Sequence, residues 1–345
     1  MESVCAVLTH FSRPEVTFTC LERLLAQTRP LDRIIIVNNN TPDDPALERF
    51  RRCAESRGAA GVLRILQMEK NLGNAGGCAA GLDEAFSSRE IDYVWMLDDD
   101  SWPRPDTLQS LMASPAFCPQ SPLPLVRMAM VVDPAKGDEL SWPLTARASH
   151  DDGEAWRHIE RRRYLPPGDA VPSRGGWLGA LYPRALWEAV GGPTAELFIR
   201  GEDEEYPLMA RRAGFRFTTV PSALLEHPSP PCPLLRYDFG GKSFFYEPGM
   251  PDARFYYKVR NWAWLQRSSH PGRPLLRLAA CGAYAVLAVN AMLQSGETAP
   301  RRLYTLFRAL HNGFYGHLRP YAAEPGKKTS FTGSTKKCLE KENSD

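Results

Sequence analysis

The chain has 345 residues, of which 43% are hydrophobic and 24% charged, so it is long enough for one large domain or two with a sizeable core. Its net charge of only +2 argues against general nucleic-acid binding. The eight cysteines form no CxxC pair and several lie in apolar segments, which indicates reduced thiols and a cytoplasmic location; we expect no signal peptide before the first apolar run.

Short apolar runs alternate with helical patterns through the first hundred residues. Strands are predicted at 4–9, 33–37, 62–67 and 91–97, and helices at 14–27, 46–56 and 76–86. The strand segments are continuously apolar, which is typical of parallel strands whose two faces are both covered by helices. The first part of the chain therefore predicts an α/β fold.

The pattern changes after residue 100. Further strands are predicted at 128–132, 177–182 and 215–220, and a helix at 204–213 that stops at Gly214. The polar stretch 134–170 is expected to be rich in loops. We expect the added strands to complete a mixed, mainly parallel sheet.

The segment 236–322 differs from the rest in charge and aromatic content. It holds twelve basic and four acidic residues, a net charge of +8, which leaves about −6 for the remainder. This composition suggests contact with an anionic surface such as a membrane. Within it, 275–293 is apolar apart from one arginine and one asparagine, so a membrane-spanning helix and a packed or interfacial helix both fit. The polar tail 323–345 is expected to be disordered.

Three adjacent carboxylates follow the predicted strand 91–97. Asp98, Asp99 and Asp100 lie where the chain leaves the sheet, and ligands of open α/β sheets bind at this edge. Like charges this close favour a cationic ligand, and a divalent metal that also holds a diphosphate suits carboxylate oxygens. Alternate residues of an extended segment point the same way, so Asp98 and Asp100 can face one ion. A solvated acidic turn is the other interpretation.

Polar residues and glycines also follow the other predicted strands. They are Thr9, His10 and Arg13 after the first strand, Asn38 after the second, and Asn71, Gly76 and Gly77 after the third. Asparagine can donate to and accept from a nucleobase edge, and glycine lets the backbone approach a ligand closely. Taken singly, the asparagine can belong to a turn and the glycines can serve helix packing.

Together with the acidic triplet, these segments resemble the nucleotide-sugar-binding half of the family 2 glycosyltransferases of the GT-A fold. The resemblance implies a Rossmann-like α/β sheet flanked by helices, followed here by a helical C-terminal extension. It implies that the polar segments, Asp98 and Asp99 bind the donor, and that Asp98 and Asp100 bind Mn²⁺ or Mg²⁺. The family usually has aspartate where this chain has Asn38. Asparagine can still accept from the imide N–H of uracil or thymine, so a UDP or dTDP donor fits.

A second acidic group opens the predicted helix 204–213. The segment 197–206 (LFIRGEDEEY) and the later His227 resemble the galactofuranosyl- and rhamnosyltransferase branch of the family. In that branch the second member of an acidic pair acts as base and a histidine completes the metal site. The resemblance thus implies that Asp203 is the catalytic base, that Glu202 contacts the acceptor and that His227 binds the metal. Asp203 can equally cap a helix, and His227 can be a surface loop residue.

Two further segments resemble parts of the same branch. Trp177 lies in the segment 175–179 (GGWLG), which matches a Gly/Trp segment at the junction of donor and acceptor, where an indole stacks on a sugar. A core tryptophan is the alternative. The segment 254–261 (RFYYKVRN) is similar to a Tyr-Tyr…Arg-Asn segment of rhamnosyltransferase-like members, and we expect a basic helix near a lipid-linked acceptor.

The sequence therefore predicts an inverting, metal-dependent glycosyltransferase that moves galactofuranose or rhamnose to a hydroxyl of a glycan or lipid-linked saccharide during cell-surface polysaccharide synthesis. The catalytic domain is predicted at 1–235, and 236–322 is predicted to contact the cytoplasmic face of the plasma membrane peripherally. A sugar nucleotidyltransferase is an alternative, but it would need a glycine-rich loop where 9–13 reads THFSR. A non-catalytic nucleotide-sugar-binding protein is the other alternative, against which the combined acidic and histidine set speaks.

Overall fold

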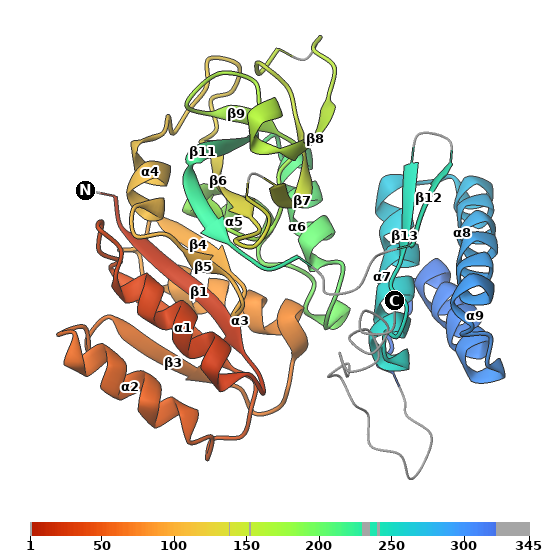
Figure 1. Cartoon of the computed structure of the whole chain (residues 1–345), viewed down its shortest axis with the longest axis horizontal. Coiled ribbons are helices and arrows are strands. Elements are labelled where there is room, and N and C mark those ends of the chain that lie inside the picture. The colour runs from red at the N-terminus through yellow and green to blue at the C-terminus, as the bar shows by residue number, and fades with distance from the viewer. Residues whose placement is uncertain (1, 138, 152, 230–234, 240–241, 322–345) are drawn as a thin grey trace. The chain divides into compact units, whose positions relative to one another are not determined.

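The computed structural model in Figure 1 describes residues 2–137, 139–151, 153–229, 235–239 and 242–321. The chain forms two compact units, and they are described separately. The first comprises Met1–Ala195 and Glu202–Ser229, and the second comprises Glu196–Gly201 and the chain from Pro230 onward. The division falls a few residues before the predicted boundary at 235, and the assignment of Glu196–Gly201 to the second unit was not predicted. The predicted disordered tail 323–345 lies outside the described residues.

One mixed sheet forms the centre of the first unit. Its strands, among the described residues, are β1 (Val4–His10), β2 (Arg33–Asn38), β3 (Leu63–Gln67), β4 (Tyr93–Leu97), β5 (Trp102–Pro103), β6 (Val126–Val132), β7 (Glu139–Ala146), β8 (Arg157–Arg161), β9 (Val171–Ser173), β10 (Ala180–Pro183) and β11 (Phe217–Glu226). They follow the order β3-β2-β1-β4-β10-β6-β11-β9-β7-β8, and β5 pairs with β11.

The sheet is mixed, as expected. Strands β3, β2, β1 and β4 are parallel, whereas β10 runs antiparallel to both of its neighbours, β4 and β6. Beyond them only β6 and β11 pair in parallel in the described chain. The stretch 134–170 was expected to be rich in loops, and two strands that were not predicted, β7 and β8, lie within it as an antiparallel pair. Residues of β7 and β8 are partly exposed, so these strands lack the continuous apolar run by which other strands were predicted.

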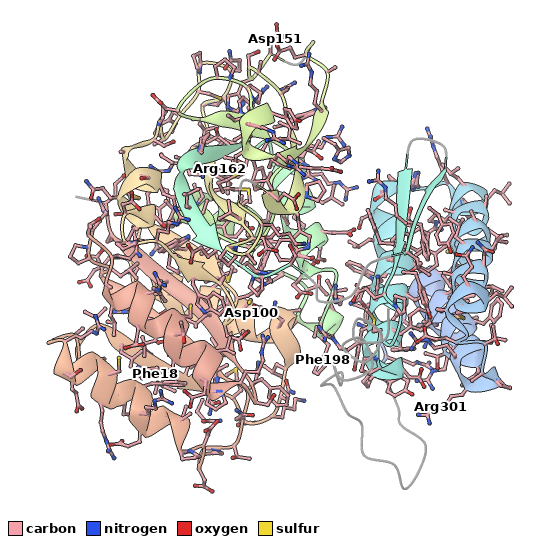
Figure 2. All side chains as sticks on the ribbon, in the orientation of Figure 1. Phe18, Asp100, Asp151, Arg162, Phe198 and Arg301 are labelled. Carbon is pink, nitrogen blue, oxygen red and sulfur yellow. The ribbon has the colours of Figure 1, made fainter. Side chains whose placement is uncertain are left out.

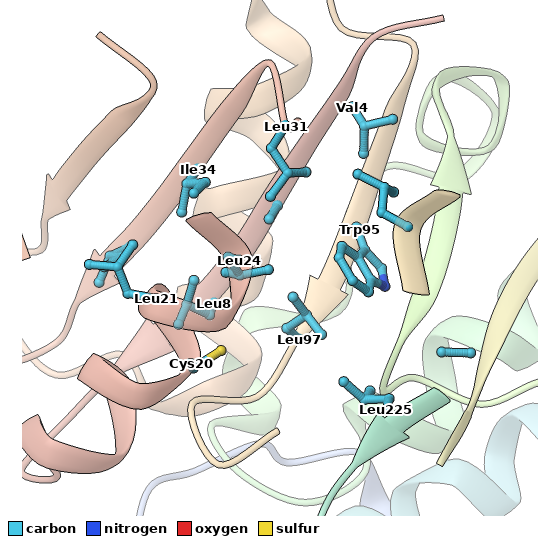
Figure 3. Packing of buried hydrophobic residues seen from close by; sticks show 14 of the residues in the cluster. Val4, Leu8, Cys20, Leu21, Leu24, Leu31, Ile34, Trp95, Leu97 and Leu225 are labelled. Carbon is cyan, nitrogen blue, oxygen red and sulfur yellow. The ribbon is translucent and has the colours of Figure 1, made fainter. Parts of the chain in front are cut away.

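Helices cover both faces of this sheet. They are α1 (Pro14–Leu25), α2 (Ala46–Ser56), α3 (Gly73–Ser87), α4 (Thr107–Ala113), α5 (Arg184–Val190) and α6 (Glu202–Arg212), with 3₁₀ turns at Arg162–Tyr164 and Ala195–Leu197. Alternate strand residues face opposite layers: Leu8 packs with residues of α1, α2 and α4, and Val7 packs with residues of α3, α5 and α6. Figure 3 shows the first layer, in which Leu21 and Leu24 of α1 lie against Leu8 and Leu97 of the strands.

The second unit is mostly helical. The β12 (Leu235–Phe239) and β13 (Lys242–Tyr246) strands form a hairpin, and α7 (Asp252–Ser269), α8 (Pro274–Ser295) and α9 (Pro300–Tyr315) follow it. Aromatic and small residues of the three helices form a separate core. Helix α8 is long and apolar enough to cross a membrane by length and composition, and only 28% of its most apolar stretch is buried. Such a helix also occurs in soluble proteins and at membrane interfaces, so the alternatives stated for 275–293 both stand.

Candidate active site

The acidic triplet follows β4 in the middle of the sheet, because β4 lies between β1 and β10. Asp99 is buried, and Asp98 and Asp100 are partly buried. Figure 2 labels Asp100. Burial raises the pKa of Asp99 to about 7, since a carboxylate loses hydration there. The triplet is therefore not the freely solvated acidic turn that remained open from the sequence.

An arginine from the neighbouring strand end partly neutralises these carboxylates. Arg13 precedes α1, and its Nη1 donates to Asp100 Oδ2 at 2.7 Å while its Nη2 bonds to Asp99. Nearly half of the Arg13 side chain stays exposed, at 47%. Because a guanidinium can hold two carboxylates and remain accessible, Arg13 is placed to meet an anionic group that enters this edge of the sheet.

His227 reaches the same carboxylates from the end of β11. Its Nε2 lies 3.3 Å from Asp100 Oδ1, and its Nδ1 lies 2.6 Å from the Pro228 carbonyl oxygen. A carbonyl can only accept, so Nδ1 carries the hydrogen and Nε2 faces Asp100. Burial opposes protonation of the ring, but the hydrogen bond and the charge of Asp100 raise the pKa of His227. Trp142 of β7 packs on the imidazole with a centroid separation of 4.5 Å.

Asp98, Asp100 and His227 have side chains of the types that bind divalent metals. Asp98 Oδ1 is buried and accepts no hydrogen bond from the described chain. Burial, together with the charges of Asp100 and Asp203, raises the pKa of Asp98 to about 6. An imidazole whose other nitrogen donates to a backbone carbonyl is held in the tautomer that binds metals. In the described part of the chain no three His, Cys, Asp or Glu side chains form a ready metal cage, which agrees with the bonding of Asp99 and Asp100 to Arg13.

The acidic pair of α6 faces two different environments. Glu202 is buried, with Oε1 accepting from Asn74 Nδ2 at 3.0 Å, while its Oε2 has no partner among the described residues. Burial and the charge of Asp203 raise the pKa of Glu202 to about 8. Asp203 is exposed. The pair thus presents one carboxylate to solvent beside one buried carboxyl group that holds its proton. We call the group Asp98, Asp99, Asp100, Glu202, Asp203 and His227 the acidic site.

Comparison with known proteins identifies the family of this chain. Residues 5–114 match a family described as "Glycosyl transferase family 2". The chain is 31% identical over 238 residues to galactofuranosyltransferase GlfT1 of Mycobacterium tuberculosis, covering 66% of this chain and 70% of that protein. It is 29% identical over 232 residues to GlfT1 of Mycolicibacterium smegmatis, covering 66% and 71%. The chain belongs to the family 2 glycosyltransferases. The predicted family and the predicted glycosyltransferase activity are confirmed.

A solved structure supports the fold of this glycosyltransferase. The crystal structure of GalNAc-T7 with UDP, GalNAc and Mn²⁺ superposes with a TM-score of 0.51 at 13% identity. The match covers 77% of this chain and 47% of that one, so this chain spans less than half the length of its neighbour. At this identity the likeness concerns the fold alone, and it confirms the predicted GT-A fold.

The donor-side residues of the glycosyltransferase are largely bonded to one another. Asn38 Nδ2 donates to Gln67 Oε1 at 2.7 Å, and Asn38 Oδ1 accepts from the backbone of Asn40. His10 is fully buried, with Nδ1 2.7 Å from Thr17 Oγ1 and Nε2 3.1 Å from Asp44 Oδ2. These side chains build the loops that end β1 and β2. We call His10, Asn38, Asn40, Asp44 and Gln67 the scaffold network.

The remaining donor-side residues also have structural partners. Thr9 Oγ1 donates to Asn74 Oδ1 at 2.7 Å, and Asn71 Oδ1 accepts from the backbone of Gly73. A Cβ on Gly77 would lie 2.6 Å from Thr9 Cγ2, so this glycine lets α3 approach β1 closely. Gly76 is also buried in α3, where a Cβ would lie 2.7 Å from Leu72 Cβ. Both glycines therefore have the packing role that the sequence left open.

Trp177 lies in the core of the glycosyltransferase. It is buried and packs edge-on against Tyr206, with 5.7 Å between ring centroids. Its Nε1 has no partner among the described residues. The indole face is thus covered by protein, which favours the core alternative over direct stacking on a sugar.

Sequence reasoning missed two residues of this region. Asn74 connects Thr9 to Glu202, and its only signal was its place in the NLGNAGG segment. Trp142 supports His227 from a stretch that was expected to be loop, so nothing marked it. Both residues contact partners that are distant in the sequence, and local sequence patterns do not predict such contacts.

Proposed function

We propose that this glycosyltransferase transfers galactofuranose from UDP-galactofuranose to a saccharide hydroxyl with inversion at the anomeric carbon. The observation that carries the proposal is the exposed Asp203 carboxylate beside the partly buried Asp98, Asp100 and His227. Asp203 lies close enough for its charge to raise the pKa of Asp98, and His227 lies 3.3 Å from Asp100. The two GlfT1 relatives favour galactofuranose over rhamnose, the other sugar predicted from the sequence. The UDP part of the proposal rests on the family resemblance, since the Asn38 amide is buried and bonded within the protein.

The reaction in this proposal is a single displacement. The acceptor oxygen bonds to the anomeric carbon on the face opposite the diphosphate, while the bond from that carbon to the diphosphate oxygen breaks. Asp203 takes the proton of the acceptor hydroxyl as the oxygen attacks. The buried Glu202 keeps its proton near neutral pH, so it can donate a hydrogen bond to a sugar oxygen while Asp203 remains the base.

The metal in this proposal is held by Asp98, Asp100 and His227. An imidazole ligand favours Mn²⁺ over Mg²⁺, since Mg²⁺ prefers oxygen donors and water. A bound divalent ion would neutralise charge on the departing diphosphate. Arg13 adds a second positive charge, and its partial exposure allows it to contact a donor phosphate.

The second unit supports an acceptor at a lipid surface. Exposed apolar side chains lie along α8, with Leu275 exposed by 80%, Val286 by 69% and Leu293 by 64%. The exposed Arg273 precedes the helix, and the unit carries an excess of basic residues. Apolar and basic side chains together suit the anionic cytoplasmic face of a membrane, where a lipid-linked saccharide would be available. Co-sedimentation with anionic vesicles but not with zwitterionic ones is the expected result.

A donor panel tests the proposed function. Purified protein with Mn²⁺ is incubated with UDP-galactofuranose, UDP-galactopyranose and dTDP-rhamnose, with a synthetic lipid-linked galactofuranosyl acceptor. We expect a product with UDP-galactofuranose alone, and NMR of the new anomeric centre should report inversion. Transfer from dTDP-rhamnose at a higher rate would overturn the choice of sugar. Retention at the anomeric carbon would overturn the mechanism.

A further inference from the structure

We propose that Arg260 and Asn261 are positioning residues for catalysis. They hold the loop Glu196–Gly201 through its main-chain carbonyl groups, and the peptide bond after Gly201 leads directly to Glu202 and Asp203. The inference rests on the proposed role of Asp203 as base. It gives a role to the segment 254–261, whose function the sequence left unassigned.

Asn261 of α7 bonds to three main-chain carbonyl groups of this loop. Its Nδ2 lies 2.9 Å from Leu197 O and 3.1 Å from Ile199 O, and it also bonds to Arg200 O. The amide carries only two hydrogens, so at least one is shared between two carbonyls. Asn261 is buried, with 1% of its surface exposed. Three carbonyl groups of the loop therefore converge on one side-chain amide, and water has almost no access to this amide.

Arg260 fixes the direction of that amide and adds two contacts. Its Nε donates to Asn261 Oδ1 at 2.8 Å, which forces Nδ2 of the amide toward the loop. Its Nη2 donates to Glu196 O at 2.8 Å and to Leu197 O at 3.0 Å. The guanidinium is fully buried and lies over the Tyr257 ring. Two adjacent residues thus bond to carbonyls of Glu196, Leu197, Ile199 and Arg200.

The loop has a backbone conformation that needs such support. Phe198 and Arg200 have φ values of 66° and 69°, a region that side chains other than glycine rarely adopt. Gly201 has φ of 114°, and a Cβ there would lie 3.0 Å from Asn261 Cβ. Strained residues of this kind persist where surrounding contacts hold them, and they concentrate at functional sites. The strain lies immediately before the acidic pair.

Side chains of the loop are held as well. Phe198, labelled in Figure 2, stacks on Tyr257 with a centroid separation of 4.9 Å. Arg200 donates to Glu247 at 2.9 Å, and Lys258 holds the same carboxylate at 3.0 Å. The loop is therefore fixed by α7 and by the turn before it. Gly201 ends this loop, and α6 begins at the next residue, Glu202.

The test compares Asn261→Asp with Arg302→Lys. The aspartate keeps the shape of Asn261 and its contact with Arg260, but it presents oxygen to the loop carbonyls in place of Nδ2. Arg302 is also a buried arginine of the second unit; it bonds to Met250 O and Asp252, and none of its bonds reaches the loop. Each variant is measured for melting temperature, for kcat and KM with UDP-galactofuranose, and for amide hydrogen exchange in peptides covering 196–205.

We expect Asn261→Asp to lower kcat on the order of 10²-fold, with KM for the donor changed by less than about twofold, because small displacements of a catalytic group cost this much. Exchange in 196–205 should accelerate. Arg302→Lys should keep kcat and loop exchange even if its melting temperature falls further. Unchanged loop exchange in Asn261→Asp overturns the inference, and so does faster exchange with unchanged kcat. If the wild type transfers no sugar from any donor, the proposed function fails by itself, and loop exchange still decides whether Asn261 holds the loop.

Discussion

The scaffold network and the aspartate triplet of the acidic site follow neighbouring parallel strands, yet the polar groups of the two regions are satisfied very differently. In the scaffold network, both ring nitrogens of His10 and both polar atoms of the Asn38 amide have protein partners. In the acidic site, Asp98 Oδ1 and Glu202 Oε2 are buried without partners in the described chain. Buried polar groups normally pair, and we expect a ligand to complete the bonding of these two carboxyl oxygens. Polar residues that follow predicted strands thus stabilise loops in the scaffold network, and in the acidic site they are available to bind a ligand.

The largest expected effect is that of Asp203→Asn in the acidic site, which should lower activity without lowering stability. The amide cannot take a proton from the acceptor, and positioned bases contribute about 10²–10⁴-fold to rate. We expect kcat to fall by that factor while donor affinity and the free energy of unfolding stay near wild type. Steady-state kinetics and donor-binding calorimetry measure this. Near-normal turnover of Asp203→Asn would remove Asp203 from the mechanism.

Asn38→Ala should lower stability and leave catalysis nearly unchanged, the reverse of Asp203→Asn. The substitution removes the partners of Gln67 Oε1 and of the Asn40 backbone N–H, which costs about 1–3 kcal/mol in the free energy of unfolding. Urea denaturation measures this loss, and kcat per folded molecule should change little. A large loss of donor affinity with unchanged stability would instead place Asn38 on the nucleobase.

Glu202→Gln should alter how stability depends on pH. Burial raises the pKa of Glu202 to about 8 in the folded protein, above its ordinary value of 4.5. The folded state therefore binds this proton more tightly than the unfolded state does. The resulting stability is fully present below about pH 4.5 and is lost as the pH rises toward 8. Denaturation at pH 5, 6.5 and 8.5 should show wild type losing stability relative to Glu202→Gln. A constant difference would contradict the buried, protonated state.

Local patterns predicted most of the first unit. Continuous apolar runs located β1 to β4, and Gly214 marked the end of α6. The strands β7 and β8 escaped because a half-exposed antiparallel pair lacks such a run. The antiparallel direction of β10 was not predicted, because it depends on how distant segments pair, which no local pattern specifies.

The candidate site was predicted in its composition but not in its bonding. The acidic triplet, Asp203 and His227 were identified by residue type and resemblance, and the structure brings them together. The bonding of Asp99 and Asp100 to Arg13 joins residues that are far apart in the chain, and so does the hold of Arg260 on Glu196. Contacts of this kind depend on the finished fold.

Donor binding with and without Mn²⁺ tests the central claim most directly. We expect calorimetry to detect UDP-galactofuranose binding to wild type and to Asp203→Asn only when Mn²⁺ is present. Residues that only contact the ligands of a metal contribute about 10–100-fold to metal affinity. Asp98 is proposed as a direct ligand, so Asp98→Ala should weaken Mn²⁺-dependent binding at least about tenfold. Equal donor affinity with and without Mn²⁺, unchanged in Asp98→Ala, would contradict a metal site built from Asp98, Asp100 and His227.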